Sequence, residues 1–533
     1  MSELKAALCK LSDIGDGEMR EFDVGETPVL LTRVGGKVNA IGARCTHYGA
    51  PLVDGFLAGD KIICPWHHAC FNARTGDLIE PPALDSLPNY QVRIEGDDIY
   101  VDLSEDADDR RTPEMVEADP SEDGRTFVIL GAGAAGYMAA QTLREDGFAG
   151  LILMITREDR MPYDRPNLSK DYLAGNAEPE WMPLRPGDFF DRNRIEVLRG
   201  REVVGVDSSA KGIMFADGES LNYDAMLIAT GGVPRSPGFV KGSEENVFLL
   251  RSFRDADAIV ARAEKGSRAV VIGSSFIGME AAASLKTRGC DVTVVSPDEV
   301  PFEKVLGVDI GKLFKSTHEQ NGIKFKLGRS VKGLTGSEKI VDGVELDDGE
   351  RLEVDLVVIG IGVRPATDLL KGVEIHKDGG VITDEHLCVG EDLYAAGDIA
   401  YFPDARTGEM TRIEHWRTAL QLGRTAAHNM AGKPTPFAAV PFFWTTQFDV
   451  TLNYVGHVRE WDSVVFQGDP ESREFLAFYI KDHRILAVAG MNRDRDIAIW
   501  EELIRQNQVP SPSELDSEAN VSDLLSSAAN NTL

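Results

Sequence analysis

Two short groups of cysteine and histidine near the start of the chain have the residue types of a metal centre. Cys45 and His47 form a Cys-x-His group, and Cys64 and His67 form a Cys-x-x-His group after sixteen intervening residues. Two thiolates and two imidazoles suit a [2Fe-2S] cluster in which one iron takes the cysteines and the other takes the histidines. The same side chains also suit a tetrahedral zinc ion, so the residues alone leave both centres open.

A glycine-rich turn between a strand and a helix predicts a nucleotide site. The apolar run 127–130 leads into Gly-x-Gly-x-x-Gly, formed by Gly131, Gly133 and Gly136. Glycine at these places allows a tight turn, close approach of the backbone to a pyrophosphate and close packing of the helix. Glu158 follows the next apolar run, where a carboxylate that binds a ribose is expected, although it could equally be a solvated loop charge.

A second strand-turn-helix motif predicts a second nucleotide site. It contains Gly273 and Gly278, but Ser275 replaces the middle glycine, which weakens the motif without destroying it. Asp298 and Glu299, after the next strand, offer carboxylates to a ribose hydroxyl, and no arginine stands beside them to bind a 2′-phosphate. We therefore expect NADH as the substrate rather than NADPH.

Composition limits the class of protein. The 533 residues are enough for several domains. The formal net charge of −31 would repel nucleic-acid phosphates and anionic lipid. No apolar run is long enough for a membrane span, and no targeting segment is visible. We expect a cytoplasmic protein that binds neither nucleic acid nor membrane, with protein and small-molecule partners.

The chain changes character along its length. Short β-rich segments fill residues 1–103, and the acidic stretch 104–124 is nearly without large apolar side chains, which predicts a flexible linker. Strands then alternate with helices, which predicts α/β nucleotide-binding units. Residues 437–510 are typical of a further α/β domain, and the tail 511–533, rich in Ser, Asn and Asp, is predicted to be disordered.

The N-terminal 103 residues resemble the Rieske family, whose ligand pattern is matched by Cys45, His47, Cys64 and His67. This resemblance favours [2Fe-2S] over zinc. Ala50 and Trp66 stand where the respiratory branch of the family has an extra disulfide, so the domain is similar to the ferredoxin-like branch. The hydroxyl donors that the respiratory branch places near the second ligand loop are also absent, because the matching positions here are Ala69 and Phe71.

Residues 125–460 resemble the ferredoxin-reductase and apoptosis-inducing-factor-like flavoproteins. The resemblance rests on the first glycine motif, LIATGG at 227–232, YAAGDI at 394–399 and PYDRPNLSK at 162–170. It implies an FAD-binding domain in two parts, 125–250 and 368–436. Between them it implies an NADH-binding domain at 251–367, followed by a C-terminal reductase domain at 437–510.

The same resemblance implies roles for particular side chains. Lys170 should approach the flavin N5, although it could equally be an exposed helix lysine. Glu280 should lie near flavin and nicotinamide, where it could pair with Lys170 or simply cap a packed helix. Trp416 should lie near the flavin, on the electron route or in the core. The further cofactor-binding residues implied are Arg165, Thr230, Gly231, Gly273, Gly278, Gly397 and Asp398.

These expectations combine into one electron path. The segment 165–172 has no cysteine, so electrons should not leave as thiols. We expect an FAD-dependent NAD(P)H oxidoreductase that passes electrons from NADH to FAD, to its own Rieske [2Fe-2S] cluster, and on to an acceptor such as an oxygenase component. The alternatives are a redox-sensing or interaction protein of the apoptosis-inducing-factor-like type and an NADH oxidase.

Overall fold

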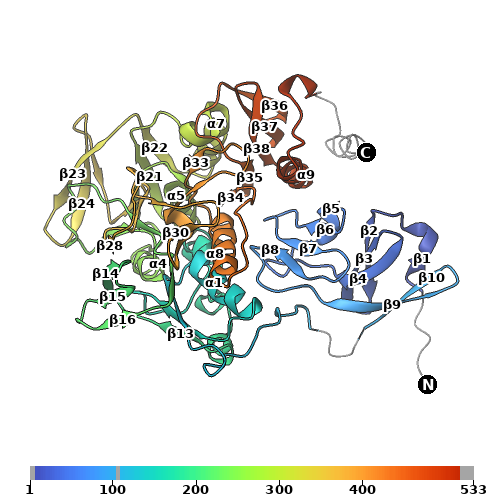
Figure 1. Cartoon of the computed structure of the whole chain (residues 1–533). Helices are drawn as coiled ribbons and strands as arrows, with labels where there is room; N and C mark the ends of the chain where they lie inside the picture. Colours follow the sequence, from blue (N-terminus) through green and yellow to red (C-terminus); the bar gives the residue numbers. More distant parts are fainter. Residues whose placement is uncertain (1–6, 104–107, 516–533) are drawn as a thin grey trace.

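The computed structural model describes residues 7–103 and 108–515, which form an N-terminal β domain beside a larger part with two nucleotide-binding lobes (Figure 1). The main sheet of the β domain is antiparallel, in the order β1-β10-β9-β4-β3-β2. Its strands are β1 (Cys9–Lys10), β2 (Met19–Val24), β3 (Thr27–Val34), β4 (Lys37–Gly42), β9 (Asn89–Glu95) and β10 (Asp98–Asp102). A hairpin joins β9 and β10, and Gly96 supplies the positive φ that its tight turn needs.

A second, four-stranded sheet carries the two cysteine-histidine groups. It runs in the order β5-β6-β7-β8, with β5 (Phe56–Ala58), β6 (Lys61–Ile63), β7 (Cys70–Asn72) and β8 (Leu78–Glu80). The loop between β4 and β5 holds the first group, and the loop between β6 and β7 holds the second. A shared core under these loops includes Leu52, Ile62, Phe71 and Leu87, so the N-terminal domain is all-β as expected.

The flavin lobe is built on a mostly parallel sheet in the order β13-β12-β11-β17-β31-β30. Its strands are β11 (Thr126–Leu130), β12 (Leu151–Ile155), β13 (Ile195–Leu198), β17 (Ala225–Ile228), β30 (Cys388–Gly390) and β31 (Leu393–Ala395). Helices α1 (Ala134–Glu145) and α8 (Trp416–Met430) pack closely against each other. Gly423 permits this, because a Cβ there would lie 2.1 Å from the carbonyl oxygen of Ala135.

The nicotinamide lobe repeats this design with a five-stranded parallel sheet in the order β19-β26-β20-β21-β22. The strands are β19 (Val247–Leu249), β20 (Arg268–Ile272), β21 (Asp291–Ser296), β22 (Lys324–Leu327) and β26 (Leu356–Ile359). Helices α4 (Phe253–Val260), α5 (Phe276–Thr287) and α7 (Val308–Gln320) accompany it. The two strand-turn-helix motifs of the sequence therefore head two separate α/β units, as expected.

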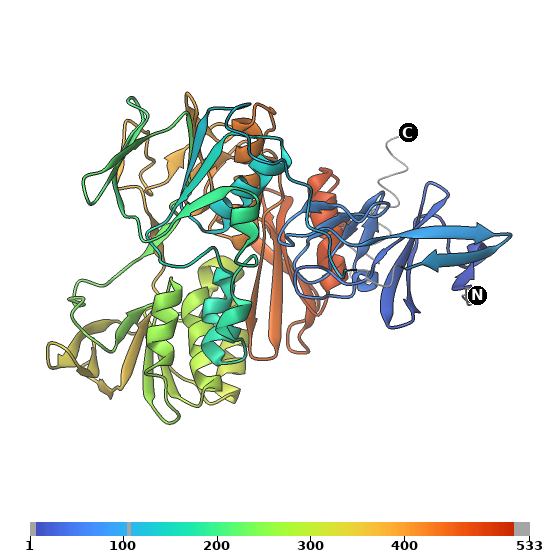
Figure 2. The same ribbon diagram turned by 90° about the horizontal axis from the view of Figure 1, so that it is seen from below.

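The C-terminal domain lies between the two lobes and the N-terminal β domain (Figure 2). Its antiparallel sheet has the order β34-β35-β38-β37-β36, with β34 (Phe442–Gln447), β35 (Val450–Gly456), β36 (Ser463–Asp469), β37 (Glu474–Lys481), β38 (Arg484–Met491) and helix α9 (Asp494–Arg505). Successive side chains of a strand point to opposite faces of the sheet. In β34, Phe442 therefore packs with α9, and Phe443 packs with the nicotinamide lobe.

A buried cluster of charges fixes the N-terminal domain to the reductase. Glu501 of α9 accepts hydrogen bonds from Arg417 (3.0 Å) and Arg505 (2.6 Å) and also pairs with His68, beside the second cysteine-histidine loop. Arg505 further pairs with Glu80 of β8. Although burial acts against it, Arg417, His68 and Arg505 hold the pKa of Glu501 well below its ordinary value. This arrangement joins three domains at one carboxylate.

The acidic stretch is not a free tether where the structure describes it. Residues 104–107 lie outside the described residues, but Arg111 forms a β-bridge with Ser86. Further along, the amide of Val116 donates to the Arg144 carbonyl and the amide of Asp119 donates to that of Ala149. Met115 also packs against the core of the flavin lobe, so this part of the stretch is held to its neighbours by main-chain hydrogen bonds and an apolar contact. Of the predicted tail, residues 516–533 lie outside the described residues.

Candidate cluster, flavin and nicotinamide sites

The two cysteine-histidine loops are alike in backbone geometry. The amide of Cys45 donates to the carbonyl of Ala50, and the amide of Cys64 donates to that of Ala69, both at 2.9 Å. Each loop also has one residue at positive φ, Gly49 in the first and His68 in the second. The two cysteine-histidine groups, which are separated in the sequence, thus lie on two similar turns that face each other.

The four side chains meet as two pairs. The Nδ1 atoms of His47 and His67 are 3.2 Å apart. The Cys64 thiol beside Cys45, together with burial, raises the pKa of the Cys45 thiol. No three of these donor atoms, all on described residues, lie within 4.8 Å of one another. A tetrahedral zinc ion would bring all four to within about 4 Å, because its bonds are about 2.0–2.3 Å long. The donor set fits a two-iron cluster with one pair on each iron.

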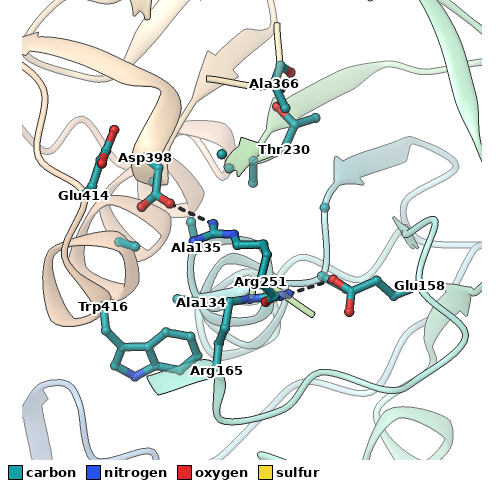
Figure 3. A pocket seen from close by; sticks show the side chains of 18 of the residues that line it. Ala134, Ala135, Glu158, Arg165, Thr230, Arg251, Ala366, Asp398, Glu414 and Trp416 are labelled. Carbon is teal, nitrogen blue, oxygen red and sulfur yellow. Dashed lines mark hydrogen bonds and ion pairs between the residues drawn. The ribbon is translucent and has the colours of Figure 1, made fainter. Parts of the chain in front are cut away.

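The flavin candidates line one cavity of about 390 Å³ in the flavin lobe (Figure 3). Those the structure brings together there are Gly131, Gly133, Glu158, Arg165, Lys170, Thr230, Gly231, Glu280, Gly397, Asp398 and Trp416. Gly136 is set back in α1 and does not line the cavity. The residues come from both parts of the flavin domain and, through Glu280, from the nicotinamide lobe, so the cavity exists only in the folded chain.

The head of α1 suits a pyrophosphate. A Cβ at Gly131 would lie 2.1 Å from the carbonyl oxygen of Ala229, and one at Gly136 would lie 1.8 Å from that of Gly131. At Gly133 a Cβ would meet no atom within 4 Å, because this residue borders the cavity. Gly133 also caps α1 without a side-chain hydrogen bond, which leaves amide donors and the positive helix end for an anion. These observations fit FAD.

Two ion pairs hold charged groups at the cavity wall. Arg165 donates to Glu158 at 2.8 Å, and Arg251 donates to Asp398 at 2.9 Å (Figure 3). Burial acts to raise the pKa of Glu158, but Arg165 and the Tyr163 hydroxyl hold it below its ordinary value. Arg251 was missed in the sequence, since no motif marks it and its partner is 147 residues away.

A buried network joins Lys170 to Glu280. Lys170 Nζ lies 2.9 Å from Glu280 Oε2, and the Ser169 hydroxyl donates to the same oxygen at 2.6 Å. The hydroxyl of Thr445, on β34, donates to Glu280 Oε1 at 2.8 Å. Lys170 and Glu280 both line the flavin cavity, so the expected pairing is present and is anchored by three domains.

The second glycine motif forms a similar turn at the head of α5. A Cβ at Gly273 would lie 2.3 Å from the Gly360 carbonyl oxygen, and one at Gly278 would lie 2.4 Å from that of Gly273. The Ser275 hydroxyl donates to the Gly360 carbonyl at 2.7 Å, so it turns inward and the tight turn is kept. Gly273 and Gly278 do not line the flavin cavity, but Phe276, Ile277 and Glu280 of α5 do.

A tryptophan that sequence reasoning missed contacts both the candidate cluster site and the candidate flavin site. Trp444, on β34, lines the flavin cavity, and its ring centroid lies 4.3 Å from that of His67 and 6.3 Å from that of His47. Trp416, the tryptophan singled out in the sequence, also lines the flavin cavity, at the start of α8 (Figure 3). Trp444 lies in the strand FFWTTQ, which carries no sequence motif. Its position beside both candidate sites is therefore visible only in the tertiary structure.

Family models match three consecutive parts of the chain. Residues 5–91 match the Rieske [2Fe-2S] domain, residues 125–423 match the pyridine nucleotide-disulphide oxidoreductases, and residues 442–525 match the reductase C-terminal domain. The chain therefore belongs to the FAD-dependent pyridine nucleotide oxidoreductases of the ferredoxin-reductase type, with a Rieske domain fused to its N-terminus.

Individual relatives agree with this assignment. The chain is 40% identical to apoptosis-inducing factor 3 of Homo sapiens over 502 residues, which are 92% of this chain and 82% of the human protein. It is 33% identical to rhodocoxin reductase of Rhodococcus erythropolis over 372 residues, covering 70% of this chain and 87% of that protein. A chain of the covalent putidaredoxin reductase–putidaredoxin crystal structure aligns with a TM-score of 0.72 and 30% identity, covering 76% of this chain and 99% of that one.

The helices were also considered as candidate membrane spans. Among the helices within 7–103 and 108–515, none combines the length and the apolar character that a membrane crossing needs.

Proposed function

We propose that the chain oxidises NADH and passes the electrons through FAD to its own Rieske cluster, which then reduces an external acceptor protein such as an oxygenase component. Bound FAD accepts a hydride and releases single electrons, and the cluster takes them one at a time. The chain's own residues bind the two cofactors, hold them close to each other and exclude water between them.

The contact between Trp444 and His67 carries this proposal. Trp444 lines the flavin cavity and also contacts a cluster-ligand candidate, His67. Electron tunnelling falls off more slowly through contacting groups than across gaps, so this ring offers a short route between the sites. The buried Glu501 cluster supports the same reading, because it keeps the Rieske domain docked without a separate encounter step.

Lys170 and Glu280 have a positioning role in this proposal. Glu280 neutralises the Lys170 ammonium and aims it at the cavity, where its Nζ can stabilise negative charge or hold a proton beside the flavin ring. The Ser169 and Thr445 hydroxyls fix Glu280 in turn. Glu158, Arg165, Thr230 and Asp398 are proposed to bind the rest of FAD.

The preference for NADH also stays a proposal. Asp298 lies after β21, and Lys304 Nζ is 2.7 Å from its Oδ1. A 2′-phosphate held beside Asp298 would face this carboxylate, whose negative charge repels it. The buried Ser296 hydroxyl accepts a hydrogen bond from Ser274 at 2.8 Å. Binding of the ribose hydroxyl is therefore proposed for the nearby carboxylates of Asp298 and Glu299.

Anaerobic reduction of the chain loaded with both cofactors tests the proposal. NADH should bleach the flavin first, and the paramagnetic signal of a reduced Rieske cluster should appear afterwards in the same molecules. A flavin that is bleached while the cluster stays oxidised would contradict the proposal. That result would favour an NADH oxidase if oxygen then consumed the electrons, and a redox sensor if the reduced flavin simply persisted.

A further inference from the structure

A second cavity, of about 440 Å³, lies between the Rieske domain and the reductase. We call it the interdomain cleft, and the residues used here to define it are Tyr48, Trp66, His67, Asp171, Gln447, Asp449, Asn453 and Asp494. It is separate from the flavin cavity, although Lys170 and Trp444 border both. Of the four cluster-ligand candidates, His67 is the one that lines the cleft. A molecule held there is one imidazole away from the cluster site.

Two buried amide side chains of the cleft each have a carbonyl oxygen without a hydrogen-bond partner. The Asn453 amide donates to Asp494 at 3.0 Å, and the Gln447 amide donates to Thr445 at 2.9 Å. Their carbonyl oxygens, Asn453 Oδ1 and Gln447 Oε1, are buried and have no hydrogen-bond partner. Both residues are at most 2% exposed. Buried acceptors without partners are uncommon, and they indicate a missing donor.

The charges of the cleft favour a cation. Asp171 supplies an exposed carboxylate to the cleft. Asp449 is also exposed but pairs with Arg473 at 3.0 Å, just as Lys170 pairs with Glu280. Two aromatic rings of the Rieske domain also border the cleft, Tyr48 at 44% and Trp66 at 41% exposure. Aromatic faces attract lysine and arginine side chains, and exposed tryptophan and tyrosine are frequent anchors of protein contacts.

The net charge of the whole chain also favours a positively charged partner. Its formal net charge of −31 attracts positively charged proteins over long distances and speeds their encounter. The Rieske domain is held against the reductase by buried charges, so a partner does not need to displace it to reach His67 through the cleft.

We propose that the interdomain cleft is where the external acceptor collects electrons, and that this acceptor is a protein that inserts a lysine or arginine side chain beside its own redox centre. The step transfers one electron from the reduced cluster through His67 to the oxidised acceptor, and no bond is made or broken. This inference rests on the proposed function, because the cluster must first be reduced by NADH.

The test uses cytochrome c, a basic one-electron acceptor protein, with the full chain loaded with both cofactors. Asp171→Asn and Asp449→Asn should each raise KM for cytochrome c by about two- to fivefold, the size expected for one solvent-exposed charge pair. The double variant should combine the two effects. Asp109→Asn, which removes an equally exposed acid (84%) of the acidic linker, is the matched control and should leave this KM unchanged.

Two small oxidants of opposite charge test whether the interdomain cleft accepts a basic protein or only a small cation. Hexaammineruthenium(III) is a cation rich in N–H donors, and ferricyanide is an anion with acceptors only. If both carboxylate variants affected the ruthenium complex but not cytochrome c, a basic protein would be excluded as the occupant. If KM for cytochrome c moved no more than in Asp109→Asn, the cleft would be excluded altogether.

Reduction by NADH without any acceptor keeps this inference separate from the proposed function. The rate at which the Rieske signal appears should be the same in the carboxylate variants and in the parent chain. A cluster that NADH never reduces overturns the proposed function, whereas a cluster that is reduced normally and responds to no charge change in the cleft overturns this inference alone.

Discussion

The ring of Trp444 lies 4.3 Å from the imidazole of His67, centroid to centroid, and Trp444 also lines the flavin cavity. Strand β34 thereby inserts one side chain between a cluster-ligand candidate and the flavin site. The neighbouring side chain of the strand, Thr445, fixes Glu280 by a hydrogen bond. Trp444 thus contacts a cluster-ligand candidate, and the next residue, Thr445, holds Glu280 at the flavin cavity. Through these two residues the C-terminal domain contributes to both candidate sites.

Replacement of this tryptophan should slow electron transfer between the two centres. Trp444→Leu should reduce the rate of cluster reduction after flavin bleaching by roughly tenfold or more, equivalent to about 1.4 kcal/mol in a barrier. Flavin reduction by NADH should be unchanged. Stopped-flow absorbance separates the two phases. Trp416→Leu is the matched control, and an equal or larger loss in that variant would transfer the relay role to Trp416.

Removal of a cluster ligand should not affect the flavin. His67→Ala should abolish the Rieske paramagnetic signal and leave FAD bound and reducible by NADH, because the ligand loops and the flavin cavity are in different domains. The control is His386→Ala, which changes a half-exposed histidine of the flavin domain. An intact Rieske spectrum in reduced His67→Ala would refute the ligand assignment.

The buried charges at the domain interface should matter for stability. Glu501→Gln removes the only negative side chain that contacts both Arg417 and His68 within the described residues. Breaking a buried ion pair in this way costs about 3–5 kcal/mol. Denaturant unfolding should show a loss of this order. Glu319→Gln, which breaks an exposed helical pair with Lys315, should cost only about 0.3–0.5 kcal/mol, and equal losses would argue against a structural role for Glu501.

The sequence was sufficient for features that depend on local spacing and insufficient for those that depend on distant partners. The cluster ligands and the first glycine motif follow from residues a few positions apart, which one loop or one turn brings together. The contact between His68 and Glu501 spans 433 positions, and that between Thr445 and Glu280 spans 165. No periodicity or motif encodes such pairs. The contacts of the acidic stretch could not be predicted for the same reason, since its hydrogen bonds are to other segments.

The preference for NADH can be measured directly. If Asp298 binds the ribose as proposed, kcat/KM should be higher for NADH than for NADPH by about tenfold or more, or about 1.4 kcal/mol. Asp298→Asn should reduce this ratio, because it weakens the pairing and leaves Lys304 free to approach a 2′-phosphate. Comparable efficiencies with both nucleotides in the parent chain would remove the argument.

The last prediction concerns the reduction potential of the cluster, which we expect near the low end of the Rieske range of roughly −150 to +300 mV. Hydrogen bonds to the cluster sulfurs stabilise the more negative reduced state, so donors raise the potential. Ala69 and Phe71, buried beside the second ligand loop, have no hydroxyl group to donate. Surface carboxylates act in the same direction, but salt screens them beyond about 8–10 Å, so local hydrogen bonding should dominate.

A redox titration of the full chain, followed by the paramagnetic signal, gives the midpoint, and Ala69→Ser tests its cause. Adding a hydroxyl at this position should raise the potential, because it restores a donor near the cluster. Thr75→Val, which removes a hydroxyl from the loop after β7, is the control and should leave the potential unchanged. A low potential suits a carrier that feeds oxygenase-type acceptors. A midpoint above about +100 mV would contradict both the hydrogen-bond argument and the proposed direction of electron flow.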